Sequence, residues 1–379
     1  MPKFSFSEFF AGGGMARAGL GDGWDCVLAN DIDAMKCATY RANWDANDLI
    51  EGDIADLPAT ALQKEIDLYW ASSPCQDFSL AGAGQGLEGR KSSVFYPWVE
   101  HVKNAVRGGY APRIIAFENV TGLLSSNAGQ DFAAVVAAFT GLGYFVGATI
   151  VDARRFLPQS RPRLFVIAVK KTEILPEFLA GERGDCPHPQ VARAYDALPE
   201  SLKSQWIWWK LPNRPPNTPP LSEMVTYSEG EQAWFSDEQT QRLVALMNGA
   251  HRAKLAAAQQ SGKLVVGTIY KRGRPNGAGK TVQRAELRLD GVAGCLRTPR
   301  GGSSRQTVMF IQGQTVKARL LSKQEAARLM GLPDDYILPE RYNDAYLLAG
   351  DGVAVPVVRF LAETIFEPIL MLNAARQAA

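Results

Sequence analysis

The chain has 379 residues, of which 46% are hydrophobic and 21% charged, and its 41 Lys and Arg nearly balance 39 Asp and Glu. These values are ordinary for a globular protein that is long enough for two domains and a sizeable core. A membrane-spanning protein is not expected, because no apolar run approaches the roughly 20 residues that a bilayer requires.

The first 170 residues alternate strand-like and helix-like segments. Strands are expected at 3–9, 26–29, 66–71, 113–118 and 164–169. Helices are expected at 15–20, 34–43, 95–107 and 130–142. This alternation predicts an α/β fold with a doubly wound, mostly parallel sheet. A strand and a glycine loop begin at once, so we expect no signal peptide and a cytoplasmic protein.

Two of these strands end at residues that are suited to bind a small molecule. The loop Ala11-Gly12-Gly13-Gly14 follows the first strand, and glycine loops bring the backbone close to a ligand. It lacks the GxGxxG spacing, so a dinucleotide site is the weaker interpretation, and a simple tight turn remains possible. Asp31 ends the second strand, where a carboxylate commonly holds ribose hydroxyls.

The next two strands end at a thiol and a carboxylate. Pro74-Cys75-Gln76 follows the strand at 66–71, and Glu118 ends the strand at 113–118. A nucleophile and a carboxylate at the ends of two strands can face one substrate. Taken alone, Cys75 could equally be a buried structural thiol and Glu118 an ion-pair partner.

The β–α pattern breaks after residue 171, and prolines become dense, most clearly at 211–220. One helix is expected at 239–259 and short strands at 264–270 and 285–289, in a second domain spanning 186–318. Trp206, Trp208 and Trp209 are expected in a core. A capped helix should begin after Ser322, with Glu325 three residues on, and a long apolar helix should cover 355–372.

The stretch from 271 to 305 is basic, with nine Lys or Arg against Glu286 and Asp290. Such a stretch can neutralise phosphates, and Arg272 and Arg274 could face a DNA groove. The alternative is a set of solubilising surface charges. The five cysteines of the chain are scattered and form no CxxC pair, so neither a metal site nor a disulfide framework is expected.

Segments in one order along nearly the whole chain resemble the motifs of the cytosine-C5 DNA methyltransferases. They are 9–14, 30–33, 52–54, 74–76, 118–120, 159–163 and 350–353. The last one departs from the family, because Gly350-Asp351-Gly352-Val353 has Asp where relatives usually have Asn. The resemblance implies the class I S-adenosylmethionine-dependent methyltransferase fold with a smaller inserted target-recognition domain.

This resemblance also implies an activity, a cofactor and domain limits. The protein would move a methyl group from S-adenosylmethionine to C5 of a flipped-out cytosine in duplex DNA, through a covalent bond between Cys75 and C6. Residues 1–185 would form the catalytic domain, 186–318 the target-recognition domain, and 319–379 a hinge and a return to the catalytic domain.

The roles of individual residues follow from the same resemblance. The catalytic residues would be Cys75, Glu118, Arg161 and Arg163. The cofactor would contact Phe10, Ala11, Gly12, Gly14, Asp31, Ile32, Asp53, Ile54, Pro74, Asp351 and Val353. The DNA would contact Gln76, Ser79, Gln85, Asn119, Gln159, Arg272, Arg274, Arg297 and Thr298.

The expected partner is double-stranded DNA, with a cognate restriction endonuclease as a second candidate, and the protein is expected to be a monomer associated with the nucleoid through DNA. Methylation of cytosine in tRNA by the same chemistry is an alternative, which the large segment 186–318 disfavours because sequence readout needs surface. A catalytically silent DNA-binding relative is a third interpretation, against which the intact Cys75, Glu118 and Arg163 argue.

Overall fold

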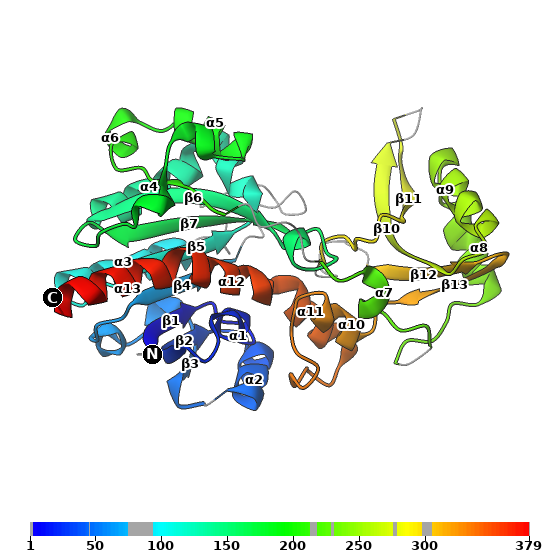
Figure 1. The fold of residues 1–379 in the computed structure, drawn as a ribbon. Helices are drawn as coiled ribbons and strands as arrows, with labels where there is room; N and C mark the ends of the chain where they lie inside the picture. Colours follow the sequence, from blue (N-terminus) through cyan, green and yellow to red (C-terminus); the bar gives the residue numbers. More distant parts are fainter. Residues whose placement is uncertain are drawn as a thin grey trace. The chain divides into compact units, whose positions relative to one another are not determined.

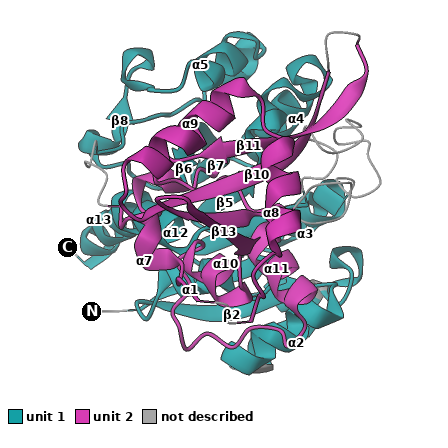
Figure 2. Cartoon of the chain, turned by 90° about the vertical axis from the view of Figure 1, so that its right-hand side faces the viewer, with its two compact units in different colours: residues 1–152, 162–214, 353–379 teal, residues 153–161, 215–352 magenta. Residues whose placement is uncertain are grey.

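The computed structural model describes residues 3–44, 46–74, 94–212, 218–228, 231–275, 279–297 and 305–378. The chain divides into two compact units, shown in different colours in Figure 2. Unit 1 consists of residues 1–152, 162–214 and 353–379, and unit 2 of residues 153–161 and 215–352. These limits differ from the sequence-based ones, because unit 2 begins at 215, extends to 352 and includes a short segment that precedes β7.

Unit 1 is built on a seven-stranded sheet in the order β3-β2-β1-β4-β5-β7-β6 (Figure 1). The strands are β1 (Phe4–Phe9), β2 (Trp24–Asp31), β3 (Leu49–Glu51), β4 (Leu68–Ser72), β5 (Ile114–Asn119), β6 (Tyr144–Asp152) and β7 (Pro162–Lys170). β7 runs antiparallel to both β5 and β6, and the other pairings are parallel. The doubly wound, mostly parallel sheet expected from the sequence is therefore confirmed, although β6 had not been predicted.

Helices cover both faces of this sheet. They are α1 (Met15–Leu20), α2 (Ala34–Asn43), α3 (Phe95–Arg107), α4 (Gln130–Gly141), α5 (Pro189–Asp196), α6 (Glu200–Lys203), α12 (Val355–Leu361) and α13 (Glu367–Ala378). Successive residues of a strand point to opposite faces. Accordingly Tyr69 packs on Phe9 at 5.2 Å between ring centroids, whereas the neighbouring Trp70 packs on Phe366 at 6.3 Å.

The C-terminal segment therefore contributes to the core of unit 1. A π-helical turn at 362–366 joins α12 to α13, so the long apolar helix expected here is locally widened. Arg359 on α12 donates to the carbonyl of Leu20 at 2.6 Å and pairs with Glu367, which accepts from the indole of Trp24. No helix in the described part of the chain is long and apolar enough to span a membrane.

The aromatic residues expected in a core lie beside β6. Trp209 in the short strand β9 (Trp208–Trp209), which pairs with β8 (Ala180–Gly181), is buried. Trp206 and Trp208 are half-buried and pack against Tyr195 at 5.4 and 4.6 Å. The core prediction is thus confirmed for Trp209 and only partly for the other two.

Unit 2 contains a four-stranded antiparallel sheet in the order β11-β10-β12-β13. Its elements are α7 (Leu221–Met224), α8 (Asp237–Ala245), α9 (Gly249–Gln260), β10 (Val265–Pro275), β11 (Thr281–Arg288), β12 (Thr307–Gln312), β13 (Thr315–Leu320), α10 (Lys323–Arg328) and α11 (Tyr342–Asp351). The prediction of a single helix at 239–259 is wrong, because two helices, α8 and α9, cover this segment. Asn248 starts a new helix there, because its side chain accepts from the backbone N–H of His251 at 3.0 Å.

A buried ion pair fixes the start of α10 in unit 2. Ser322 and Glu325 form the predicted capping box, and Glu325 also pairs with Arg319 at 2.6 Å, both side chains being at most 3% exposed. Burial alone would raise the pKa of Glu325, but donation from Arg319 and from the N–H groups of Ser322 and Thr226 lowers that pKa overall. The carboxylate thus ties three segments together.

Replacing Glu325 with Ala should strongly destabilise the protein, because the Arg319 guanidinium would remain buried without its carboxylate. The expected loss in free energy of unfolding is about 3–5 kcal/mol, measured by urea denaturation. Glu238→Ala removes an exposed carboxylate that pairs with Arg242 on α8, and it should cost only about 0.5 kcal/mol. Equal losses in the two variants would contradict the role assigned to Glu325.

Candidate active site

The loop between β1 and α1 has an unusual backbone. Phe10, Gly12 and Gly14 all have positive φ angles, of 58°, 58° and 78°. A side chain at position 14 would force Trp44 to move, because its Cβ would lie 2.3 Å from Nε1 of Trp44. The same Nε1 donates to the carbonyl of Gly13 at 3.1 Å. The loop is therefore held tightly against the end of α2, and within it Gly12 is half-buried whereas Ala11, Gly13 and Gly14 are buried.

Asp31, the last residue of β2, fixes this loop from the other side. One carboxylate oxygen accepts from the N–H of Gly12 and the other from the N–H of Asp33, each at 2.8 Å. The side chain is buried, with 8% of the residue exposed. Each carboxylate oxygen can accept a second hydrogen bond. Asp31 can therefore still hold a pair of hydroxyl groups while it anchors the loop.

The ends of β2 and β3 lie together beside Asp31. The carbonyl of Asp31 accepts from the N–H of Gly52 at 2.9 Å, and Asp53 caps the short turn Ile54–Asp56 by accepting from Ala55. Ile32 is 65% exposed, a large value for an apolar side chain. An exposed isoleucine between two acidic strand ends is a suitable platform for one face of a flat apolar ring.

Ile54, a predicted cofactor contact, is held in place by the core and by α3. Its side chain is 3% exposed and lies in the core, and its carbonyl accepts from Nε2 of His101 on α3 at 2.7 Å. His101 was not singled out from the sequence, and it holds this turn against α3. Within the described residues no group of three or more His, Cys, Asp or Glu could hold a metal ion.

Glu118 and Arg163 are brought together at the ends of β5 and β7. Arg163 Nε lies 3.1 Å from Oε1 of Glu118, with the two side chains 14% and 9% exposed. β5 and β7 are antiparallel neighbours in which Glu118 faces Phe165, two residues beyond Arg163. The pairing therefore depends on the reversed direction of β7. It places a carboxylate and a guanidinium side by side beside the end of β4.

The end of β4 leads directly to the expected nucleophile. Asn119 donates from Nδ2 to the carbonyl of Ser73 at 3.4 Å and is 1% exposed, so its amide links the ends of β5 and β4. Pro74 is the last described residue before the gap and is half-buried. The expected site residues Cys75, Gln76, Ser79 and Gln85 lie outside the described residues, as does Thr298.

Gln159 and Arg161, which the sequence suggested as substrate-facing, are fully buried in unit 2. Gln159 donates to the carbonyl of Leu329 at 2.5 Å, and it is 0% exposed. Arg161 is 1% exposed and donates to the carbonyls of Gly350 and Gly352 at 2.9 and 2.6 Å. In this structure their side chains bond protein groups within unit 2, and the DNA contact of Gln159 and the catalytic role of Arg161 stay predictions.

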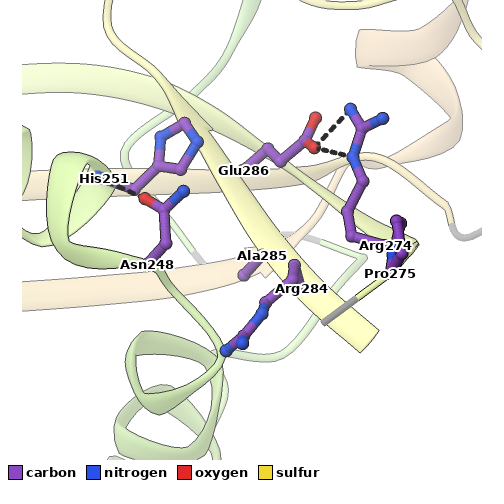
Figure 3. Close-up of a pocket in the computed structure, with 7 residues that line it drawn as sticks. All are labelled: Asn248, His251, Arg274, Pro275, Arg284, Ala285 and Glu286. Atoms are coloured by element: carbon purple, nitrogen blue, oxygen red, sulfur yellow. Dashed lines mark hydrogen bonds and ion pairs between the residues drawn. The ribbon is translucent and has the colours of Figure 1, made fainter. Parts of the chain in front are cut away.

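The other predicted cofactor and DNA contacts are divided between the two units. Asp351 is exposed at the end of α11 in unit 2, and Val353 is buried in unit 1. Arg297 is exposed in unit 2, and Arg272 and Arg274 are exposed on β10. A hollow of about 410 Å³ opens beside Arg274 (Figure 3). Its lining consists of Asn248, His251, Arg274, Pro275, Arg284, Ala285 and Glu286.

Glu8 is an ionisable residue near the loop that was not singled out from the sequence. Glu8 on β1 is 2% exposed, and burial raises the pKa of its carboxyl to about 8, against opposing effects of Arg17 and of the N–H groups of Ala16 and Arg17. The signal in the sequence was a single charged residue in an otherwise apolar or neutral strand, Phe4–Phe9. Glu8 thus links β1 to the first turn of α1, directly behind the loop.

The strand order, the reversed β7 and the loop and carboxylate at the ends of β1 and β2 define the class I S-adenosylmethionine-dependent methyltransferase fold. Solved structures with this fold match almost the entire chain. The Dnmt2 methyltransferase of S. pombe has a TM-score of 0.60 and 15% identity, with 98% of this chain and 99% of that chain covered. A putative DNA modification methyltransferase from an E. coli prophage has a TM-score of 0.56 and 16% identity, with 98% and 100% covered.

The profile of the family described as C-5 cytosine-specific DNA methylase matches residues 4–367, and the chain belongs to this family. The Type II methyltransferase M.HpaII of Haemophilus parainfluenzae is 25% identical over 385 residues, which cover 97% of this chain and 90% of the relative. M.BanI of Aneurinibacillus aneurinilyticus is 25% identical over 423 residues, covering 96% of each. The protein is therefore a DNA (cytosine-5)-methyltransferase, as the sequence motifs predicted.

Asp31→Asn should weaken binding of S-adenosylmethionine about 10- to 100-fold in isothermal titration calorimetry, because a charged acceptor is lost. Asp56→Asn, which changes an exposed carboxylate in the neighbouring turn, should leave the affinity unchanged. An unaltered affinity in the Asp31 variant, or an equal loss in both, would refute the assigned role.

Glu8→Gln should change how stability depends on pH. The unfolded chain ionises Glu8 near its ordinary value of 4.5, whereas the folded chain keeps the proton to about pH 8. The wild type therefore loses stability as pH rises from 4.5 to 8, on the order of 2–4 kcal/mol. Thermal unfolding at pH 5 and pH 8 should show that the melting temperature of the variant, relative to that of the wild type, is higher at pH 8 than at pH 5. Asp25→Asn, an exposed change on β2, controls for the loss of one charge. If the stability of the Glu8 variant depended on pH in the same way as that of the wild type, Glu8 would not be the buried acid.

Proposed function

We propose that this protein methylates C5 of one cytosine in a specific duplex DNA sequence, after that base leaves the helix, through a bond between Cys75 and C6. The observation that carries the proposal is the Glu118–Arg163 pair, 3.1 Å apart, at the ends of β5 and β7. β4 lies next to β5, and the chain reaches Cys75 three residues after β4 ends. A carboxylate and a guanidinium thus lie together at the end of β5, and the chain supplies the expected thiol three residues after the neighbouring strand.

The chemistry divides a difficult substitution into easier steps. C5 of cytosine is a weak nucleophile, but addition of the Cys75 thiolate to C6 makes an enamine in which C5 carries electron density. After C5 has gained the methyl group, a base removes its proton, the C6–S bond breaks and the thiolate leaves. The aromatic ring is then restored, and no oxidant or reductant is needed.

Glu118 and Arg163 have complementary tasks at the ring. Glu118 would hold the N3 edge of the cytosine and, as a general acid, donate a proton to N3, which neutralises the negative charge that develops there as the thiolate adds. Arg163 would donate to the ring carbonyl, and its positive charge favours the thiolate form of Cys75. Because the two side chains already contact each other, each also keeps its partner in position before the base arrives.

The residues at the ends of β1, β2 and β3 fit S-adenosylmethionine, which when bound supplies a methyl group activated by a sulfonium. Asp31 would accept from the ribose hydroxyls, and Ile32 would cover one face of the adenine. The backbone of Gly12 and Gly14 can approach the ligand closely because those positions carry no side chain. Asp53 would contact the edge of the adenine. Asp351 stays a predicted cofactor contact.

Duplex DNA as the substrate requires extrusion of the base, since C5 lies inside the stack. The glycine-rich segment 81–89 is the expected lid over that base, outside the described residues. Sequence readout would fall to unit 2, whose β10 carries Arg272 and Arg274. Relatives named Type II methyltransferases support a role opposite a cognate restriction endonuclease. We further propose a monomer that acts in the cytoplasm on nucleoid DNA.

The test begins with the site of modification. Expression in a host followed by bisulfite sequencing should reveal one methylated sequence. In a second assay, the purified protein should transfer a labelled methyl group to duplex DNA but not to tRNA. Transfer to tRNA alone would favour the alternative RNA methyltransferase. Absence of any transfer would favour a silent DNA-binding relative.

Cys75→Ala should abolish methyl transfer by at least about 10³-fold while leaving DNA affinity within about twofold, since only a bond-forming atom is removed. A duplex with 5-fluorocytosine at the methylated position should trap the wild type at Cys75, as read by mass spectrometry. Cys186→Ala, a matched change elsewhere in unit 1, should retain activity and trapping. Residual transfer by the Cys75 variant, or an adduct on another cysteine, would disprove the assignment.

A further inference from the structure

The β10–β11 hairpin of unit 2 gathers arginines on one face. Cross-strand partners lie on the same face of a sheet, and Arg272 stands opposite Arg284 while Tyr270 stands opposite Glu286. Two guanidinium groups directly opposite each other repel. The carboxylate of Glu286 lies one pair along from them, where it can reduce that repulsion.

Glu286 holds two of these arginines. Nε and Nη2 of Arg274 each lie 2.6 Å from its Oε1, and Nε of Arg272 lies 3.6 Å from its Oε2. The Arg274 and Arg272 side chains are 51% and 41% exposed, against 24% for Glu286. The acceptor is thus more enclosed than its donors, and the cations remain open to solvent.

The hollow beside this cluster offers a place for a second anion. Figure 3 shows Arg274 reaching to Glu286, with Arg284 and Asn248 also lining the hollow. Its volume of about 410 Å³ is ample for a phosphate group. One carboxylate shared by two arginines leaves an excess of positive charge at this place, which suits a phosphodiester.

The base of the hairpin is held firmly. The Arg272 guanidinium lies 5.1 Å from the centroid of the Tyr270 ring, and the Tyr270 hydroxyl donates to the carbonyl of Cys295. Ile269 and Leu287 pack into the core under the opposite face. The arginine face therefore sits on a rigid support, and only the side-chain ends need to rearrange when an anion arrives.

We propose that Glu286 limits the affinity for DNA, because it competes with DNA phosphate for Arg272 and Arg274. Exposed ion pairs are weak, so a phosphate in the hollow can displace the carboxylate. Every DNA sequence presents phosphates, and Glu286 therefore weakens binding to all of them alike. Only a sequence that also makes base contacts compensates for this penalty. The inference rests on the proposed action on duplex DNA and adds to it the reason why wrong sequences are released.

The experiment compares duplex binding by Glu286→Gln and the wild type, using fluorescence anisotropy with a random-sequence duplex. The variant should bind about two- to fivefold tighter, with a steeper dependence on salt concentration, because both arginines become available to phosphate. Binding to the target duplex, found by bisulfite sequencing, should tighten by a similar factor, because the penalty from Glu286 applies to every sequence. Methyl transfer to near-target sites should rise.

Two controls separate this role from a general charge effect. Asp290→Asn removes a carboxylate that pairs with Arg288 in the same basic stretch and should change random-duplex binding less than Glu286→Gln. In a background of Arg272→Gln and Arg274→Gln, the change at Glu286 should have no further effect.

Unchanged or weaker random-duplex binding by Glu286→Gln would overturn the proposal, and so would an effect that persists without the two arginines. A selective loss of target affinity would instead mean that Glu286 contacts a base. These readouts are binding constants of unmodified duplex, so they are independent of whether Cys75 forms the proposed adduct. If the wild type binds no duplex at all, the proposed substrate fails rather than the role of Glu286 alone.

Discussion

The carboxylate of Asp31 is the constraint on which the cofactor end of the sheet depends. It receives the N–H of Gly12 from the loop after β1 and the N–H of Asp33 from its own strand end. Positive φ angles at Phe10, Gly12 and Gly14 are strained or restrictive, so that loop conformation needs an anchor. The same residue thus shapes the loop and retains acceptor capacity for a ligand, which links stability and binding in one side chain.

Buried charge is used differently at the ends of β5 and β7. Arg161 and Arg163 are two residues apart, yet the first is bonded to the carbonyls of Gly350 and Gly352 in unit 2, and the second pairs with Glu118 in unit 1. Alternate residues of an extended chain share a direction, but the division between the compact units falls between these two. One arginine therefore stabilises the fold of unit 2 while the other pairs with the carboxylate at the end of β5, although the motif contains both.

The arginine face of the β10–β11 hairpin follows a third principle. Its arginines are held by weak, exposed ion pairs that a stronger polyanion can exchange, whereas the Arg319–Glu325 pair of the same unit is buried and permanent. The difference lies in solvent exposure, because water screens the first pair and is excluded from the second. Exchangeable pairs of this kind fit the proposed competition between Glu286 and DNA phosphate.

The amino-acid sequence by itself determined the family, the α/β class and the positions of Asp31, Glu118 and Arg163 at strand ends, because these depend on local periodicity and on motif order. The helix over 95–107 and the capping box at Ser322 were likewise local and were predicted correctly. Only the tertiary structure decided that Gln159 and Arg161 are buried, since burial depends on segments more than a hundred residues away. It also decided the break at Asn248, the antiparallel strands β12 and β13 and the pairing of Glu286 with Arg274. These arise from long-range packing and cross-strand register, which no local pattern in the sequence encodes.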